Sequence, residues 1–214
     1  MPYFQNNEHN ILFIHIPKTG GTSIEIYFST KYNIPLSNNS LYYMLNEEEQ
    51  IKNNISISTS LQHMTYQTII KYKDFFNINY DNITIITIVR NPYERTISDL
   101  FFYKKITRTS SKEEVFVVLK VYLSETLDNH NIPQYIFITN DDKELISNIK
   151  ILHTETLDND MIHLGYADFG TFRKYNVTWN KPNYYDYLNN DSIQLINDFY
   201  DYDFKLFNYK KIHK

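Results

Sequence analysis

Residues that can hold a phosphate group follow the first apolar stretch of the chain. Residues 15–23 are His-Ile-Pro-Lys-Thr-Gly-Gly-Thr-Ser, and they include two of the four glycines in the sequence. Glycines let the backbone approach a ligand closely, and a following helix N-terminus offers unpaired N–H groups. Lys18 adds a positive charge, and Thr22 and Ser23 add hydroxyl donors. The segment therefore predicts a phosphate-binding loop, because a tight turn with a helix cap would not need the lysine and both glycines.

The position of Lys18 distinguishes this loop from a Walker A loop. In a Walker A loop the lysine follows the glycines and precedes the Ser or Thr that holds Mg²⁺. Here Lys18 precedes Gly20 and Gly21. We therefore expect its charge at the end of a strand, beside the terminal group of a bound nucleotide.

A second candidate anion site follows the most strand-like run in the sequence. Residues 83–89 are β-branched throughout, and Arg90 follows them directly. Ligands bind beyond the carboxyl ends of strands in open α/β sheets, so Arg90 is expected in the same crevice as the first loop. Pro92 suits the first position of a helix, which would carry Ser98 about two turns along. Arg90 can offer a bidentate fork to a phosphate and Ser98 a hydroxyl, although Arg90 taken alone could equally pair with a carboxylate.

Both motifs belong to a pattern of short apolar strands that alternate with helices. This pattern predicts an α/β fold with a central parallel sheet covered by helices on both faces. Strands are predicted at residues 11–16, 83–89 and 149–153, and helices at 22–31, most of 61–72, 93–105, 112–127 and 191–200.

Residues 15–23 resemble the 5'-phosphosulfate loop of the carbohydrate sulfotransferases, in particular the group with the heparan sulfate and chondroitin sulfotransferases. The run Arg-Asn-Pro-x-x-Arg-x-x-Ser at 90–98 resembles the 3'-phosphate motif of the same family. The resemblance implies a P-loop-like sulfotransferase fold and 3'-phosphoadenosine 5'-phosphosulfate (PAPS) as the donor. Weaker similarities extend over most of the chain, at residues 63–65, 133–134, 153–157, 174–178 and 203–209.

The resemblance also implies roles for individual residues. Lys18 would stabilise the bridging and sulfuryl oxygens, and His63 would be the general base, because histidine titrates near neutral pH. Thr178 lies where the family closes a loop over the nucleotide. The candidate donor-binding residues are Pro17, Lys18, Thr19, Gly20, Gly21, Thr22, Ser23, Arg90, Ser98 and Thr178.

Several neighbouring residues have other interpretations. His130, His153 and Glu155 are further candidates for the general base. His15 lies within a predicted strand and is expected to pack in the core. Arg95 is expected to form a structural ion pair rather than to contact the donor.

Composition limits the classes of protein that fit. With 214 residues, 42% of them hydrophobic, the chain can form one domain over 1–214, with a mobile insertion at about 33–60. It contains no cysteine, which excludes disulfides and thiolate sites. It has no apolar run long enough for a membrane helix and no signal-peptide pattern, so a cytoplasmic protein is predicted.

Charge and ligand spacing bear on partners and cofactors. The net charge of −4 disfavours nucleic acid and a densely anionic polymer as partners. We therefore expect a small-molecule donor and a hydroxyl acceptor, most simply a neutral or weakly charged glycan. No spacing typical of metal ligands stands out, and Lys18 with helix dipoles can stabilise sulfuryl transfer, so no metal is expected.

Two other functions remain open. A P-loop-like small-molecule kinase would need a Gly-Lys-Ser/Thr ending and a carboxylate after a hydrophobic strand, where Arg90 stands instead. A catalytically inactive nucleotide-binding module would keep the pocket without turnover. The presence of both Lys18 and His63 favours an enzyme over such a module.

Overall fold

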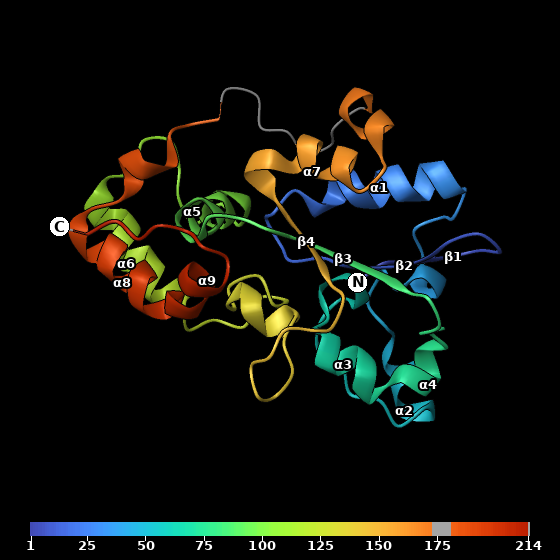
Figure 1. Cartoon of the computed structure of the whole chain (residues 1–214). Helices are drawn as coiled ribbons and strands as arrows, with labels where there is room; N and C mark the ends of the chain where they lie inside the picture. The colour runs from blue at the N-terminus through green and yellow to red at the C-terminus, as the bar shows by residue number, and fades with distance from the viewer. Residues whose placement is uncertain (173–180, 214) are drawn as a thin grey trace.

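A four-stranded sheet lies at the centre of the computed structural model, which describes residues 1–172 and 181–213. Its strands β2, β3 and β4 are parallel, as predicted, and their carboxyl ends point toward the left in Figure 1. The strands lie in the order β1 (Tyr3–Gln5), β2 (Asn10–Ile14), β3 (Thr84–Val89) and β4 (Lys150–His153).

The first strand makes the sheet mixed rather than wholly parallel. Strand β1 pairs antiparallel with β2, with Tyr3 opposite Leu12. The prediction of a wholly parallel sheet is therefore wrong at this edge. A strand of three residues is too short to give a readable alternation of apolar and polar residues, which is why the sequence did not indicate it.

Alternate residues of the central strands pack on opposite faces of the sheet. Phe13 and Ile86 belong to the cluster that contains Phe28, whereas Leu12 and Ile85 belong to the cluster on the other face. Burial on both faces explains why these strands are almost continuously apolar. Figure 1 shows α1 (Gly21–Tyr32) and α7 (Leu157–His163) above the sheet, and α2 (Glu47–Lys52), α3 (Tyr66–Lys71) and α4 (Lys73–Phe76) below it.

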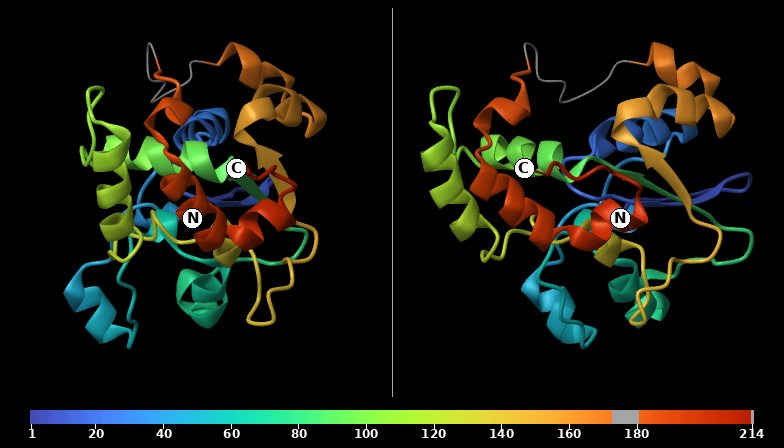
Figure 2. Two further views of the ribbon diagram at one scale, coloured as in Figure 1. Left: turned by 90° about the vertical axis from the view of Figure 1, so that its left-hand side faces the viewer. Right: turned by 60° about the vertical axis from the view of Figure 1, so that its left-hand side comes forward.

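A third group of helices lies beyond the carboxyl ends of the parallel strands (Figures 1 and 2). They share a separate apolar cluster that includes Ile97, Leu119 and Ile196. This group consists of α5 (Pro92–Phe102), α6 (Lys112–Tyr122), α8 (Asn190–Phe199) and α9 (Asp201–Leu206).

Local signals explain where the helices of this group begin. Pro92 is the first residue of α5, and the Asn91 side chain accepts a hydrogen bond from the Tyr93 N–H. Ser111 and Glu114 form a capping box at the start of α6. Helix α6 ends at Tyr122, earlier than the predicted 127, because the chain turns there toward residues 128–131.

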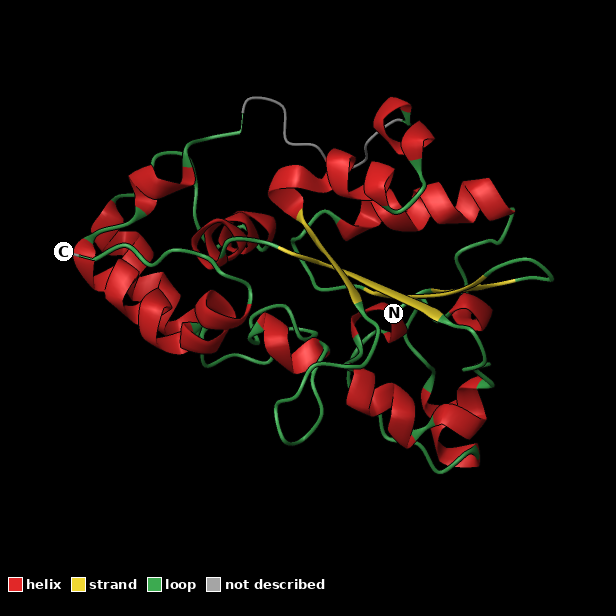
Figure 3. Ribbon diagram, in the orientation of Figure 1, coloured by secondary structure: helices red, strands yellow, loops and turns green. Residues whose placement is uncertain are grey.

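The rest of the chain consists mainly of loops and single-turn helices, as Figure 3 shows. Within 33–60, Leu41, Leu45, Ile55 and Ile57 are buried in the cluster below the sheet. The mobility of this insertion and the single domain stay predictions. None of the described helices is long and apolar enough to cross a membrane. The 3-10 helices are Asn38–Ser40, Leu61–His63, Gln134–Phe137, Thr154–Thr156, Ala167–Thr171 and Tyr184–Tyr187.

Candidate active site

The predicted phosphate loop connects the end of β2 to the start of α1. Gly20 is the N-cap of α1 and has a φ of 92°, a conformation that glycine adopts without strain. Lys18 has a φ of 67°, which is uncommon for a residue with a side chain and is concentrated at functional sites. Gly20 has no side chain that could cap the first N–H groups of α1, so an anion can take the place of a cap there.

Gly21 is required by its contact with His15. A Cβ atom at Gly21 would lie 2.5 Å from Cδ2 and 2.6 Å from Nε2 of the His15 ring. The ring cannot easily move, because His15 is buried and its Nδ1 lies 2.5 Å from the buried carboxylate of Glu25. His15 is thus packed, as predicted, and it supports the loop from below.

The loop forms one wall of a pocket of about 510 Å³ beyond the strand ends. Most of the predicted site residues come together there. The Thr19 side chain does not line it, since it is buried and its hydroxyl donates to the Ile16 carbonyl oxygen. The pocket is lined by His15, Pro17, Lys18, Gly20, Gly21, Thr22, Ser23, Tyr42, Gln62, His63, Arg90, Ser98, Phe102, His130, Thr154, Leu157, Lys181 and Tyr184.

Lys18 brings a positive charge into this pocket. Its Nζ lies over the Phe102 ring, 4.3 Å from the ring centroid. Burial lowers the pKa of Lys18, and the nearby Asp99 carboxylate opposes that effect. A bound anion would favour the charged form further, because an opposite charge stabilises an ammonium group.

Arg90 links the two predicted anion sites. It is buried at the end of β3, and its guanidinium donates to the Lys18 carbonyl oxygen at 3.1 Å and to Glu94 at 2.9 Å. Gln134 holds the Arg90 backbone through both its N–H and its carbonyl oxygen. The Arg90 Nε is buried and has no hydrogen-bond partner within the described part of the chain. A phosphate oxygen in the pocket would satisfy this donor.

Lys181 adds a second cation near Arg90 that the sequence did not indicate. Its Nζ lies 2.7 Å from a Glu94 carboxylate oxygen and 4.6 Å from the centroid of the Tyr184 ring. Burial tends to raise the pKa of Glu94, but the hydrogen bonds from Lys181 and Arg90 outweigh it and lower that pKa. Glu94 is therefore ionised and fixes both cations at this end of the pocket.

Helix α5 contributes Ser98 to the pocket and Arg95 to its support. Ser98 is half-buried and lies among the lining residues. Arg95 is structural, but the ion pair predicted for it is wrong. Its guanidinium donates to the carbonyl oxygens of Pro17, His130 and Ile132, so it joins the loop to residues 130–132. Thr178 lies outside the described residues.

His63 lines the same pocket and is oriented by Asp128. Its Nδ1 is 2.7 Å from the Asp128 carboxylate, which also accepts hydrogen bonds from the Ser60 N–H and hydroxyl. Burial lowers the pKa of His63 to about 4; the bond to Asp128 opposes this, and His15 and His130 reinforce it. His63 is therefore neutral near pH 7, with its Nδ1–H donated to Asp128 and a lone pair on Nε2.

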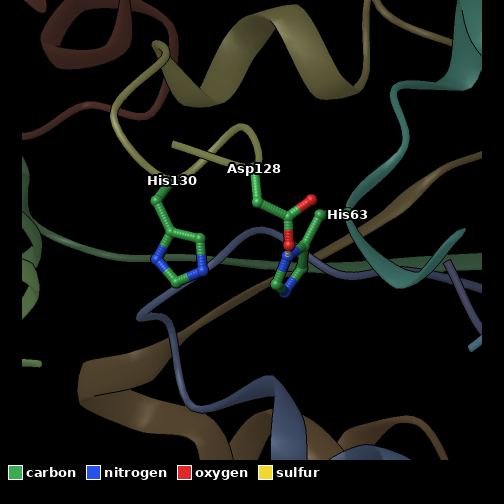
Figure 4. A group of neighbouring side chains, drawn as sticks. All are labelled: His63, Asp128 and His130. Carbon is green, nitrogen blue, oxygen red and sulfur yellow. Dashed lines mark hydrogen bonds and ion pairs between the residues drawn. The ribbon is translucent and has the colours of Figure 1, made fainter. Parts of the chain in front are cut away.

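A second histidine–carboxylate pair stands beside the first. His130 Nδ1 is 2.8 Å from Asp99, a fully buried carboxylate that also accepts from the Tyr122 hydroxyl. The His130 ring meets the His63 ring edge-on at a centroid distance of 4.9 Å. Figure 4 shows the two rings side by side, with Asp128 above His63.

The sequence shows no spacing typical of metal ligands, yet folding brings together three residues that could bind a metal ion. Each of His63, Asp128 and His130 offers one potential metal-binding atom, and these atoms lie within 4.8 Å of one another (Figure 4). Hydrogen bonds to Asp128 and Asp99 already satisfy the Nδ1 atom of each ring. This arrangement fits a proton-transfer site without requiring an ion.

The remaining candidates for the base do not line the pocket. His153 is the last residue of β4 and Glu155 follows it, and the Glu155 carboxylate accepts from the Asn91 N–H and the Tyr209 hydroxyl. These bonds give Glu155 a structural role at the start of α5. Asp128, Gln62, Phe102 and Lys181 are the main site residues that sequence reasoning missed.

Comparison with known proteins agrees with this geometry. No curated protein and no solved structure matches the chain significantly. The family model described as "Sulfotransferase family" matches residues 1–210, which is nearly the whole chain. The chain therefore belongs to the sulfotransferase family.

Proposed function

We propose that this sulfotransferase uses PAPS as its donor and transfers the sulfuryl group to a hydroxyl of a carbohydrate. The observation that carries the proposal is the meeting, in one pocket, of a lysine-containing anion loop, a buried arginine and a carboxylate-oriented neutral histidine. The resemblance of residues 15–23 to the heparan sulfate and chondroitin sulfotransferases supports the carbohydrate acceptor.

The two ends of the pocket match the two ends of the donor. The start of α1, with Thr22 and Ser23, would hold the 5'-phosphate. Arg90 and Ser98 would hold the 3'-phosphate, with Lys181 adding charge at that end. The orphan Nε of Arg90 supports this fit, since a buried guanidinium donor without a partner is costly.

The proposed reaction is an in-line displacement at sulfur. The acceptor oxygen forms a bond to sulfur, the bond between sulfur and the 5'-phosphate oxygen breaks, and the hydroxyl proton passes to His63 Nε2. The products are the sulfate ester and adenosine 3',5'-bisphosphate. Lys18 would neutralise charge that develops on the leaving oxygen, and Asp128 would keep His63 in the tautomer that accepts the proton.

Donor binding can be tested by calorimetry. Adenosine 3',5'-bisphosphate should bind tightly, whereas 5'-AMP and ATP with Mg²⁺ should bind much more weakly, because they leave the 3'-phosphate site empty. Tighter binding of ATP with Mg²⁺ would favour a kinase instead. Transfer of radiolabelled sulfate from PAPS to a glycan panel then separates an enzyme from an inactive binding module.

Replacement of Arg90 tests the 3'-phosphate site directly. Arg90→Ala should weaken binding of adenosine 3',5'-bisphosphate by about 2 kcal/mol, the worth of hydrogen bonds to a charged group. Binding of 5'-AMP should change little, and Arg108→Ala on the surface serves as the matched control. Unchanged affinity in a folded Arg90→Ala protein would remove Arg90 from the site.

The predicted cytoplasmic location stays a prediction.

A further inference from the structure

The side of the pocket around His63 is lined by polar side chains, and the Lys18 ammonium lies next to it on the Phe102 ring, on which His130 also stacks. Tyr42, Gln62, His63 and His130 line this side, the acceptor wall, whereas Lys18, Arg90 and Lys181 line the loop and the α5 side. None of the described lining residues is a carboxylate. A neutral ligand that donates hydrogen bonds suits such a wall better than a densely sulfated one, which would need cations.

His63 presents a hydrogen-bond acceptor to the acceptor wall, and His130 presents its second ring nitrogen there. An ionised carboxylate can only accept, so the Nδ1 atoms of His63 and His130 donate to Asp128 and Asp99. A neutral imidazole that donates from Nδ1 has its lone pair on Nε2. The Tyr122 hydroxyl, which also donates to Asp99, helps to fix this arrangement around His130.

Gln62 offers another acceptor on the same wall. Its Oε1 is buried and has no hydrogen-bond partner in the described part of the chain. Buried amide oxygens almost always have a partner, so an orphan one in a pocket indicates a donor on the ligand. Gln62 lines the same pocket as the two rings.

We infer that the acceptor is a neutral sugar ring whose reacting hydroxyl has a second hydroxyl on the adjacent carbon, and that the second ring nitrogen of His130 forms a hydrogen bond with this second hydroxyl. Gln62 accepts from a further hydroxyl of the same ring. The inference rests on the proposed function and extends it to the class of acceptor. His130 is thereby a residue that determines specificity, whereas His63 takes the proton of the attacking hydroxyl.

The spacing of the two rings agrees with a vicinal diol. The ring centroids of His63 and His130 are 4.9 Å apart. Two hydroxyl oxygens on adjacent carbons can each reach one of these rings at a hydrogen-bond length of about 2.8 Å. A single hydroxyl would satisfy His63 and leave the second ring nitrogen of His130 and the Gln62 oxygen without a partner, which is unfavourable in a buried site.

The experiment measures kcat/KM for a set of acceptors with the wild-type protein and with each variant. Sulfate transfer from PAPS is measured on p-nitrophenyl glycopyranosides, and then on the monodeoxy analogues of the best acceptor. For the wild-type protein, removal of the hydroxyl adjacent to the sulfated position should lower kcat/KM roughly 10-fold. His130→Ala should lower kcat/KM for the parent acceptor by a similar factor and should lose most of the discrimination against the deoxy analogue.

Two controls keep the result specific to the pocket. His163→Ala changes an exposed histidine at the end of α7 and should keep the full discrimination. Gln62→Leu should weaken a different hydroxyl contact, and Gln194→Leu on the exposed face of α8 should have no effect. Binding of adenosine 3',5'-bisphosphate to every variant shows that each one is folded.

The outcomes separate the proposed function from the diol inference. Absence of transfer to any acceptor by the wild-type protein would defeat the proposed function itself. Transfer with unchanged discrimination in His130→Ala would defeat the diol inference alone. A strong preference for sulfated oligosaccharides over neutral glycosides would overturn it as well.

Discussion

Three histidines at this site share one arrangement, in which the Nδ1 atom lies beside a carboxylate. Each carboxylate fixes the orientation and the tautomer of its ring, and the three rings form a row of edge-on contacts. His63 and His130 belong to the acceptor wall, whereas His15 lines the pocket against Gly21 of the phosphate loop. The pairs are His15–Glu25, His63–Asp128 and His130–Asp99.

Asp128→Asn should lower turnover roughly 10²-fold without weakening donor binding, within the range that a positioned base contributes. An amide has one oxygen and one NH₂ group, so its NH₂ must face either the Ser60 N–H or His63 Nδ1. An NH₂ group that faces His63 Nδ1 breaks the arrangement that keeps the lone pair on Nε2, and one that faces the Ser60 N–H sets two donors against each other and displaces the side chain. Asn also tolerates the positive φ of 46° at this position, so the backbone should be preserved.

The Asp128→Asn rates are measured across pH together with the affinity for adenosine 3',5'-bisphosphate. Asp168→Asn is the matched control, since that carboxylate bonds Tyr27 and Lys31, which do not line the pocket. Equal losses in turnover and donor affinity would mean that Asp128 has only a structural role.

Lys18→Ala should reduce turnover more than donor affinity, because charge on the leaving oxygen develops only in the transition state. Single-turnover rates and calorimetry with adenosine 3',5'-bisphosphate measure the two effects separately. Lys31→Ala, which removes a surface ion pair with Asp168, is the control. An equal loss in both quantities would make Lys18 an ordinary binding residue.

At the level of elements, the start of α1 and one face of α5 form the site. Arg95, Ser98, Asp99 and Phe102 follow the spacing of one helix face, and each contacts the pocket or supports its wall. This spacing was visible in the sequence. Asp99 and Phe102 match no motif, so the sequence did not indicate their roles. The role of Asp99 depends on its contact with His130, which only the fold brings about. In the proposed function, α5 therefore serves the donor through Ser98 and the acceptor wall through Asp99.

Gly21→Ala should weaken donor binding and destabilise the fold by about 1–3 kcal/mol, the usual cost of overpacking. The new Cβ would lie 2.5 Å from the His15 ring, which Glu25 holds in place, so the loop itself must shift. Gly170→Ala is the matched control, because nothing lies within 4 Å of a Cβ there. Urea unfolding and calorimetry measure both effects, and a Gly21→Ala protein with normal stability and affinity would contradict the predicted clash.

The three parallel strands and the glycine turn between β2 and α1 could be predicted because local sequence determines them. Residues 83–89 form β3 almost as predicted, since a β-branched apolar run has few alternatives to a buried strand. Asp128 and His130 could not be assigned, because 65 residues separate His63 from Asp128 and only tertiary packing brings them together. Two consecutive left-handed residues, Asp128 and Asn129, shape that connection, and no local pattern indicated them.

On the scale of the whole molecule, the two histidines of the acceptor wall are buried between the carboxyl ends of the parallel strands and the helix group α5, α6, α8 and α9. Burial makes the neutral form of His63 favourable and lowers its pKa to about 4. The folded state therefore holds a histidine that resists protonation, whereas the unfolded chain takes up the proton near the ordinary pKa of about 6.5. Stability and the proposed catalysis are linked through this one ring.

The contribution of His63 to stability should consequently fall as pH decreases through the window from about 6.5 to 4, where the unfolded chain binds the extra proton. His63 alone should account for a loss on the order of 2 kcal/mol between about pH 7 and pH 5. Urea unfolding at both pH values measures it, and His63→Gln should lose correspondingly less over the same interval. His163→Gln, which changes an exposed histidine, should behave like the wild-type protein. Equal losses in the wild-type and His63→Gln proteins would show that His63 does not titrate as its buried position requires.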